Sequence, residues 1–189
     1  MSRVKITLCL LAPLLLAATT PPLRYHIDAP RSAVSAKVGF LGIASKTAHF
    51  PQMNGRIALS PDRLDTIDLD VELDARQLTA GDKVTLGRLK GKDFFDVERH
   101  PTVRFSGRRM QMTGPVTATV AGEVTARGIT RPATLAVTFR DPPARATGRD
   151  PVELTARTVI DRREFGMTAY SAIVGKKVTI TIRARMVPN

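Results

Sequence analysis

Hydrophobic and polar residues alternate along most of the chain. The clearest case is residues 66–74, TIDLDVELD, in which every second residue is aliphatic and most of the others are acidic. This period of two predicts a strand with one buried and one solvated face. Further stretches with the same period lie at 34–40, 135–139 and 178–182, and weaker ones at 57–59, 103–105, 120–126 and 154–160. Turns rich in Pro and Gly separate them, so we expect about eight or nine strands.

Only residues 78–97 depart from this period, and their leucines and paired phenylalanines suit one or two short helical turns. The pattern therefore predicts a single all-β domain with a short helical segment, as a sandwich or a barrel. Small residues at inward positions favour a barrel with room inside, although small residues that face bulky ones in a filled core fit as well. These small residues are Ala36, Ala118, Gly122, Ala126 and Ala156.

The N-terminus has the layout of a secretory signal peptide. Arg3 and Lys5 precede an apolar run from Ile6 to Ala18, and small residues follow it. The run is too short for an ordinary membrane span, and no polar face interrupts it as in a packed helix. We expect residues 1–20 to be a cleaved signal peptide, residues 21–189 to form the barrel domain, and the protein to be periplasmic.

Composition narrows the partners and the chemistry. The net charge of +12 suggests phosphate, nucleic acid or an anionic membrane as partner. Aromatic residues make up only 5% of the chain and Trp is absent, which argues against a base-stacking surface and hence against nucleic acid. The single cysteine, Cys9, lies in the apolar run, so the expected mature domain has neither disulfides nor thiol chemistry.

Candidate catalytic and metal-binding residues are few. His26, His49 and His100 lie far apart and suit surface or capping roles, although a single histidine that reaches into a barrel can also bind haem iron. The acidic residues of 66–74 form a solvated strand face, and no loop is present that would fold them around calcium. No nucleophile elbow or phosphate-binding glycine loop occurs. We expect no catalytic residue, no metal and no cofactor.

Several motifs together resemble the YceI-like family of bacterial periplasmic proteins, which is associated with polyisoprenoid or lipid binding. They occur in the family's order across nearly the whole expected mature chain. The matching stretches are 25–28 (YHID), 31–34 (RSAV), 92–97 (KDFFDV), 100–105 (HPTVRF), 122–132 (GEVTARGITRP), 160–167 (IDRREFGM) and 174–175 (VG).

The resemblance implies an eight-stranded, lipocalin-like antiparallel β-barrel with a short helical segment. It also implies an apolar tunnel for a long amphiphilic isoprenoid, of polyprenyl or isoprenoid quinone type, and no catalytic residues. Two features depart from the family: residues 85–89 (TLGRL) replace a charged, His-containing turn, and the segment 167–173 is short. Both departures bear on the shape of the cavity mouth.

The alternating strands and the aromatic motifs give the candidate lumen residues. Phe94 and Phe95 suit a plug at the barrel end as well as a tunnel lining, and Phe165 and Met167 share this ambiguity. Gly128 and Gly166 suit tight turns. The candidate ligand-binding residues are Val38, Phe40, Leu69, Val71, Phe94, Phe95, Val103, Phe105, Leu135, Val137, Phe165, Met167, Ile180 and Ile182.

Three functions remain in competition. The first is a secreted carrier or scavenger of isoprenoid lipid, and the second is an envelope assembly or stress-related module with a filled core. The third is an enzyme on a hydrophobic substrate, against which the lack of an inward acid and base pair argues. The partners considered are the isoprenoid, an anionic membrane surface and a second copy of the chain.

Overall fold

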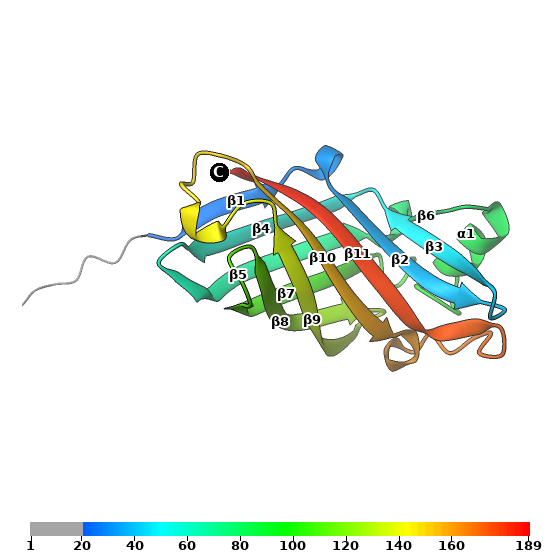
Figure 1. Cartoon of the computed structure of the whole chain (residues 1–189). Coiled ribbons are helices and arrows are strands. Elements are labelled where there is room, and N and C mark those ends of the chain that lie inside the picture. The colour runs from blue at the N-terminus through cyan, green and yellow to red at the C-terminus, as the bar shows by residue number, and fades with distance from the viewer. Residues whose placement is uncertain (1–20) are drawn as a thin grey trace, which may run out of the picture.

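The computed structural model describes residues 21–189, and that part of the chain is mostly strand (Figure 1). One short helix, α1, spans Lys83–Lys90, and four single 3₁₀ turns connect strands. The strands are β1 (Leu23–Ile27), β2 (Ala33–Phe40), β3 (Ala44–Phe50), β4 (Met53–Ser60), β5 (Arg63–Asp74), β6 (Thr79–Ala80), β7 (Thr102–Met112), β8 (Thr117–Ala126), β9 (Ile129–Phe139), β10 (Val152–Asp161) and β11 (Val174–Pro188).

The sheet closes into an antiparallel barrel of eight strands, as expected. The order around the barrel is β1, β4, β5, β7, β8, β9, β10 and β11, and pairing of β1 with β11 completes the ring. β11 is long enough to pair with β1 near Met186 and with β2 between Val174 and Arg183. β1 and β2 both pair with β11, one after the other along its length. On their far sides β1 pairs with β4 and β2 pairs with β3.

The alternation that predicted a strand over residues 66–74 is realised in β5, which pairs with β4 and β7. Ile67 is buried on the inner face, as the pattern requires. The outer face is not uniformly solvated, however, because Asp70 is only 9% exposed. The Arg104 guanidinium on β7 donates to both Asp70 carboxylate oxygens, at 2.7 and 2.6 Å. This bidentate interaction with the neighbouring strand covers the carboxylate, so Asp70 is buried where the sequence pattern predicts a solvated side chain.

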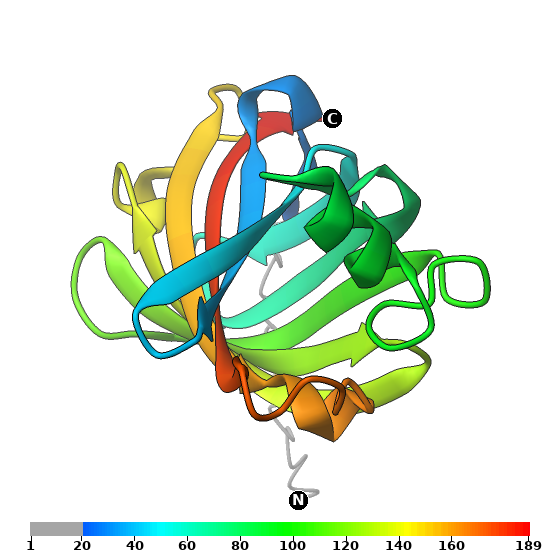
Figure 2. The same ribbon diagram turned by 90° about the vertical axis from the view of Figure 1, so that its right-hand side faces the viewer.

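The predicted helical segment is confirmed as α1. The Asp82 carboxylate caps its N-terminus by accepting from the Thr85 backbone N–H at 2.7 Å. No residue of α1 is buried, and only Leu86 and Leu89 pack against the barrel. Figure 2 shows α1 lying over one end of the barrel. The helix is therefore a thin cover with little apolar contact of its own.

Tight turns occur at both glycines predicted for them. Gly128 follows Arg127 in the two-residue turn of the β8–β9 hairpin, with φ values of 72° and 50°. Gly166 has a φ of 75° and ends the 3₁₀ turn Arg162–Phe165. Such left-handed conformations suit a glycine, because it has no Cβ.

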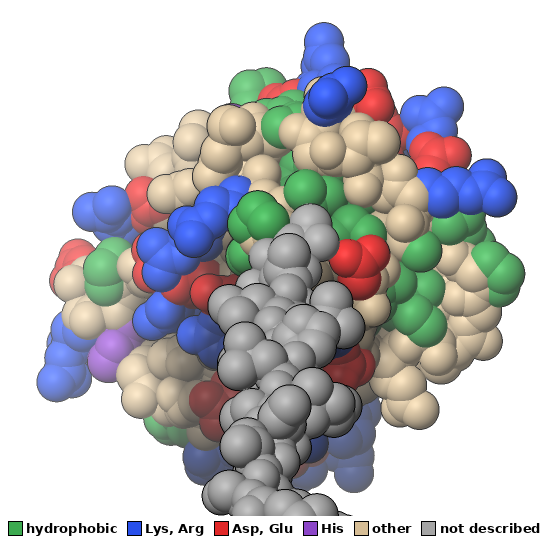
Figure 3. Space-filling model, turned by 90° about the vertical axis from the view of Figure 1, so that its left-hand side faces the viewer, with side chains coloured by type: hydrophobic (Ala, Val, Ile, Leu, Met, Phe, Trp, Pro, Cys, Tyr) green, Lys and Arg blue, Asp and Glu red, His purple; other side chains and the backbone are tan. Residues whose placement is uncertain are grey.

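Charged side chains are spread over the surface instead of gathering in one patch on the face seen in Figure 3. Lys and Arg alternate there with Asp and Glu around the end of the barrel at which β1 begins (Figure 3). Over residues 21–189 no helix has the length and apolarity to cross a bilayer. The predicted signal peptide, residues 1–20, lies outside the described residues.

Candidate functional site

The barrel encloses an apolar cavity of about 130 Å³. Side chains from β2, β4, β5 and β7 to β11 line it, together with Ile27 of β1, and nearly all of them are aliphatic or aromatic. Thr158 is a polar exception. Arg104 is the charged residue of the lining, but its guanidinium is bonded to Asp70 on the outer face of the barrel. The cavity therefore offers an apolar surface without a free charged group.

Eight of the fourteen candidate residues line this cavity, and they come from β5, β7, β9 and β11. Because inward positions recur at every second residue, each strand contributes a pair. The lining candidates are Leu69, Val71, Val103, Phe105, Leu135, Val137, Ile180 and Ile182.

The other six candidates lie outside the cavity lining, toward the end of the barrel beneath α1. Phe94, Phe165 and Met167 form a buried cluster with side chains of β8, and Leu89 of α1 packs on it. Phe95 meets Phe50 edge to face, with ring centroids 5.7 Å apart. Of the two roles left open for the phenylalanine pair, the structure places both side chains in the plug.

The two candidates on β2 lie further along that strand. Val38 and Phe40 are half-buried near the turn between β2 and β3. The Lys46 ammonium group lies 5.4 Å from the centroid of the Phe40 ring. The alternation along β2 does not show that Val38 and Phe40 lie beyond the cavity. β2 continues past the cavity, and its last inward positions face the barrel end.

The small residues act in two ways. Ala156 lines the cavity, so its short side chain leaves room there. Gly122 instead makes space for an aromatic ring, because a Cβ on it would lie 2.7 Å from Cζ of Phe105 and 2.2 Å from the Ser106 carbonyl oxygen. Gly107, its partner across the β7–β8 pair, also lies against the Phe105 ring. These glycines leave space on the wall for the ring of Phe105.

Arg162 is a residue whose role the sequence did not reveal. It is only 3% exposed, and its Nε and Nη2 donate to the carbonyls of Gly175 and Val174 at 2.9 and 3.0 Å. Nη1 donates to the carbonyl of Met167. Burial lowers the pKa of this guanidinium. Arg162 thus ties both ends of the loop between residues 167 and 174 to the barrel, a function that a basic pair in a sequence does not disclose.

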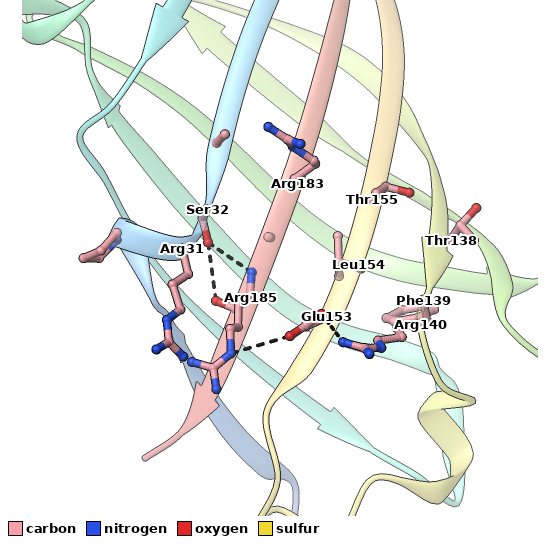
Figure 4. A pocket seen from close by; sticks show the side chains of 13 residues that line it. Arg31, Ser32, Thr138, Phe139, Arg140, Glu153, Leu154, Thr155, Arg183 and Arg185 are labelled. Atoms are coloured by element: carbon pink, nitrogen blue, oxygen red, sulfur yellow. Dashed lines mark hydrogen bonds and ion pairs between the residues drawn. The ribbon is translucent and has the colours of Figure 1, made fainter.

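A larger but shallow cleft of about 680 Å³ lies on the outer wall (Figure 4). Residues of the first 3₁₀ turn and of β2, β9, β10 and β11 line it, and Glu153 is the one carboxylate among four arginines. Arg31 and Arg183 have no ion-pair partner among the described residues. Arg140 and Arg185 contact the Glu153 carboxylate at 2.8 and 3.7 Å, and Arg185 also binds Asp28 at 2.6 Å. An apolar chain gains little there, so the interior cavity is the candidate site.

The histidines lie away from the cavity. His26 bonds to Asn189 at 2.9 Å, and His100 packs against Gly128 at the β8–β9 turn. In the part of the chain that the structure describes, no three His, Cys, Asp or Glu residues come together in a way that would hold a metal ion. The cavity lining itself contains neither a histidine nor a carboxylate.

The sequence is similar to several curated bacterial proteins. A UPF0312 protein of Pseudomonas putida strain F1 is 25% identical over 161 residues, which cover 84% of each chain. A UPF0312 protein of Pseudomonas savastanoi pv. phaseolicola is 27% identical over 118 residues, 62% of this chain and 59% of that protein.

Solved structures share the fold. BcnA of Burkholderia cenocepacia superposes with a TM-score of 0.74 at 21% identity, covering 84% of this chain and 98% of that one. A polyisoprenoid binding domain from Saccharophagus degradans gives 0.66 at 11% identity, covering 88% and 99%. The YceI-like domain family matches residues 25–186, nearly the whole barrel. The chain therefore belongs to the YceI-like family.

Proposed function

We propose that this protein is a periplasmic carrier or scavenger that binds a long amphiphilic isoprenoid lipid, of polyprenyl or isoprenoid quinone type, in the barrel lumen. The observation that supports this most is the interior cavity, whose lining is apolar and free of unpaired charge. The polyisoprenoid binding domain of Saccharophagus degradans, which has the same fold, points to the same ligand class.

The driving force is the hydrophobic effect. Each CH₂ group moved from water into an apolar lumen gains about 0.8 kcal/mol. A protein that carries such a chain through water needs an apolar enclosure of suitable shape and no reactive groups. The cavity lining lacks the paired acid and base that general acid–base catalysis uses, which favours a binding role over an enzymatic one.

The lumen has to widen to hold a long chain. A cavity of about 130 Å³ is smaller than the roughly 300–1,000 Å³ of common ligand pockets. The element suited to move is the cover formed by α1, because none of its residues is buried and only Leu86 and Leu89 pack against the barrel. We propose that the chain enters at this end by displacing α1 and the phenylalanine plug.

The periplasmic location rests on the sequence of residues 1–20, which has the charge and apolar pattern of an export signal. Sequencing the N-terminus of the protein recovered from the periplasm tests this. We expect cleavage near residues 18 to 22, and recovery of Met1 or Cys9 in the folded protein would contradict it.

Lipid extraction tests the carrier role. Protein purified from its periplasm is extracted with organic solvent, and the extract is analysed by mass spectrometry. We expect a prenyl lipid in stoichiometric amount, whereas a lipid-free protein that also fails to take up added polyprenol would refute the proposal.

The second candidate is an envelope assembly module with a filled core. The small cavity favours it, because about 130 Å³ is well below the roughly 300 Å³ at which common ligand pockets begin. A folded, stable protein that never carries lipid would select this function.

A further inference from the structure

The turn between β2 and β3 carries exposed aliphatic side chains where polar residues would fold more easily. Ile43 is 96% exposed and Leu41 is 57% exposed. Leu41 has a φ of 53°, in the left-handed region that Gly, Asn and Asp favour, and Gly42 follows it at 73°. A strained, exposed leucine contributes nothing to the core. Residues that cost stability without serving the fold point to a function.

A second loop extends this apolar surface. The Leu41 backbone N–H donates to the Ile173 carbonyl at 2.8 Å, which joins the turn to the loop before β11. Ile173 and Tyr170 of this loop are 37% and 39% exposed. Both loops lie at the end of the barrel that Figure 2 presents. We call Leu41, Ile43, Tyr170 and Ile173 the apolar tip.

Basic side chains lie on the segments that adjoin the apolar tip. Lys176 and Arg163 line a hollow between the turn and the loop, beside Gly42 and Ile173. Lys37 of β2 and Lys176 of β11 are exposed, and neither has an ion-pair partner within residues 21–189. We call these two residues the lysine rim.

Two of the acidic groups near this rim are paired with basic side chains. Asp82 binds Lys46 at 2.8 Å. Asp161 binds Arg163 at 2.8 Å and lies 4.0 Å from Lys177. Glu164 of the adjacent 3₁₀ turn is exposed and subtracts one charge from the rim. The cations without an acidic partner therefore give the surroundings of the tip a positive character.

We propose that the apolar tip and its lysine rim dock the protein on a bilayer surface that carries anionic phospholipid. The aliphatic side chains insert at the level of the headgroups, while the lysines contact the phosphates. A few inserted residues combined with several cations give reversible binding that depends on anionic lipid. Docking needs only the exposed surface, so it stands independently of the proposed carrier function.

The docked orientation brings the cover of the barrel to the membrane. The Lys46–Asp82 bond joins the strand after the turn to the N-cap of α1. On the other side, the Arg88 guanidinium of α1 lies 4.6 Å from the centroid of the Tyr170 ring. Tyr170 of the apolar tip thus contacts α1 directly, and β3, which follows the turn, contacts its N-cap. A docked protein therefore presents the α1 end of the barrel to the lipid.

Vesicle flotation tests the proposal with variants that keep the fold. The double variant Leu41→Asn, Ile43→Ser removes both aliphatic groups, and asparagine tolerates the left-handed φ at position 41. Val159→Ser is the matched control, because Val159 is also exposed, at 54%, but lies on the barrel wall in β10. Each purified protein is mixed with phosphatidylcholine vesicles with and without phosphatidylglycerol.

We expect the wild type and Val159→Ser to bind vesicles that contain phosphatidylglycerol and to be released by salt. The affinity of the double variant for these vesicles should fall by about tenfold or more, because two aliphatic side chains no longer insert. Absence of wild-type binding, or double-variant binding within twofold of wild type, would overturn the proposal. A wild-type dimer that becomes monomeric in the double variant would assign the tip to self-association and overturn it as well.

Discussion

Replacement of Ala156 by leucine is expected to fill the lumen without unfolding the barrel. Ala156 lies in β10, is 4% exposed, and lines the cavity of about 130 Å³. The isobutyl side chain of leucine points into this space, where nearly all of the surrounding side chains are apolar. It therefore needs no polar partner and removes volume that a bound chain would use.

The cavity volume sets the energetic scale. At about 24 cal/mol per Å³, a cavity of about 130 Å³ corresponds to at most ~3 kcal/mol of lost packing. One leucine fills part of it and loses some rotamer freedom, so we expect the free energy of unfolding to stay the same or to rise by about 1 kcal/mol.

Ala118 provides a matched control. It is 2% exposed on β8, within the main core cluster, but does not line the cavity. Ala118→Leu should overpack the core and lower the free energy of unfolding by about 1–3 kcal/mol. The two substitutions are chemically identical, so a difference between them reports the space inside the barrel.

Thermal or urea unfolding, measured beside uptake of a polyprenol, provides the assay. We expect Ala156→Leu to be stable and to take up little lipid. If Ala156→Leu destabilises the barrel as much as Ala118→Leu does, the lumen is filled. If it leaves uptake unchanged, the ligand binds elsewhere. Either result would contradict a lumen that is open to a lipid chain.

Three further changes probe the packing around the site. Tyr25→Phe removes a buried hydroxyl that makes no hydrogen bond of standard geometry among the described residues, although the Gly148 backbone lies near it. Urea unfolding should therefore show unchanged stability or a gain of about 1 kcal/mol, and a large loss would show that the Gly148 contact stabilises the fold. Bonding to Arg104 holds the pKa of Asp70 below its ordinary value of 3.8, so this carboxylate stabilises the fold above pH 3.8, and the contribution is lost as the pH falls through the lowered pKa. Asp70→Asn should weaken this dependence of the unfolding free energy on acid pH, and a pH profile of stability equal to that of the wild type would contradict it. Lysine at position 162 cannot replace the three bonds of the Arg162 guanidinium to backbone carbonyls, so Arg162→Lys should lower the free energy of unfolding by about 2–4 kcal/mol and speed hydrogen exchange in the loop before β11. Exchange as slow as in the wild type would show that Arg162 does not hold this loop.

Much of the fold is predictable from the sequence because one face of each strand is buried. In β5 the period of two identifies the inward residues Leu69 and Val71 directly, and both line the cavity. The same rule identified inward positions in β7, β9 and β11. The period of two does not show where the cavity ends along a strand, and so it also predicts Val38 and Phe40 as lining residues, although the cavity does not reach them.

What the sequence did not reveal depends on contacts between distant segments. Asp70 looks like any other acidic residue of β5 until Arg104 is placed beside it across the β5–β7 pair. Gly122 looks like a residue that leaves room, but the ring of Phe105 occupies that room. Arg162 could not be told from the exposed basic residues, because its three carbonyl partners come from a loop whose path the sequence does not show.

A crystal structure of the protein grown with a polyprenol of defined length would show whether the lumen holds the lipid. We expect a prenyl chain inside the barrel, in contact with Leu69, Val103 and Ile180, and displacement of α1 from the barrel end. A lumen as closed as before, with the prenyl chain bound in the outer-wall cleft beside Arg185, would contradict it.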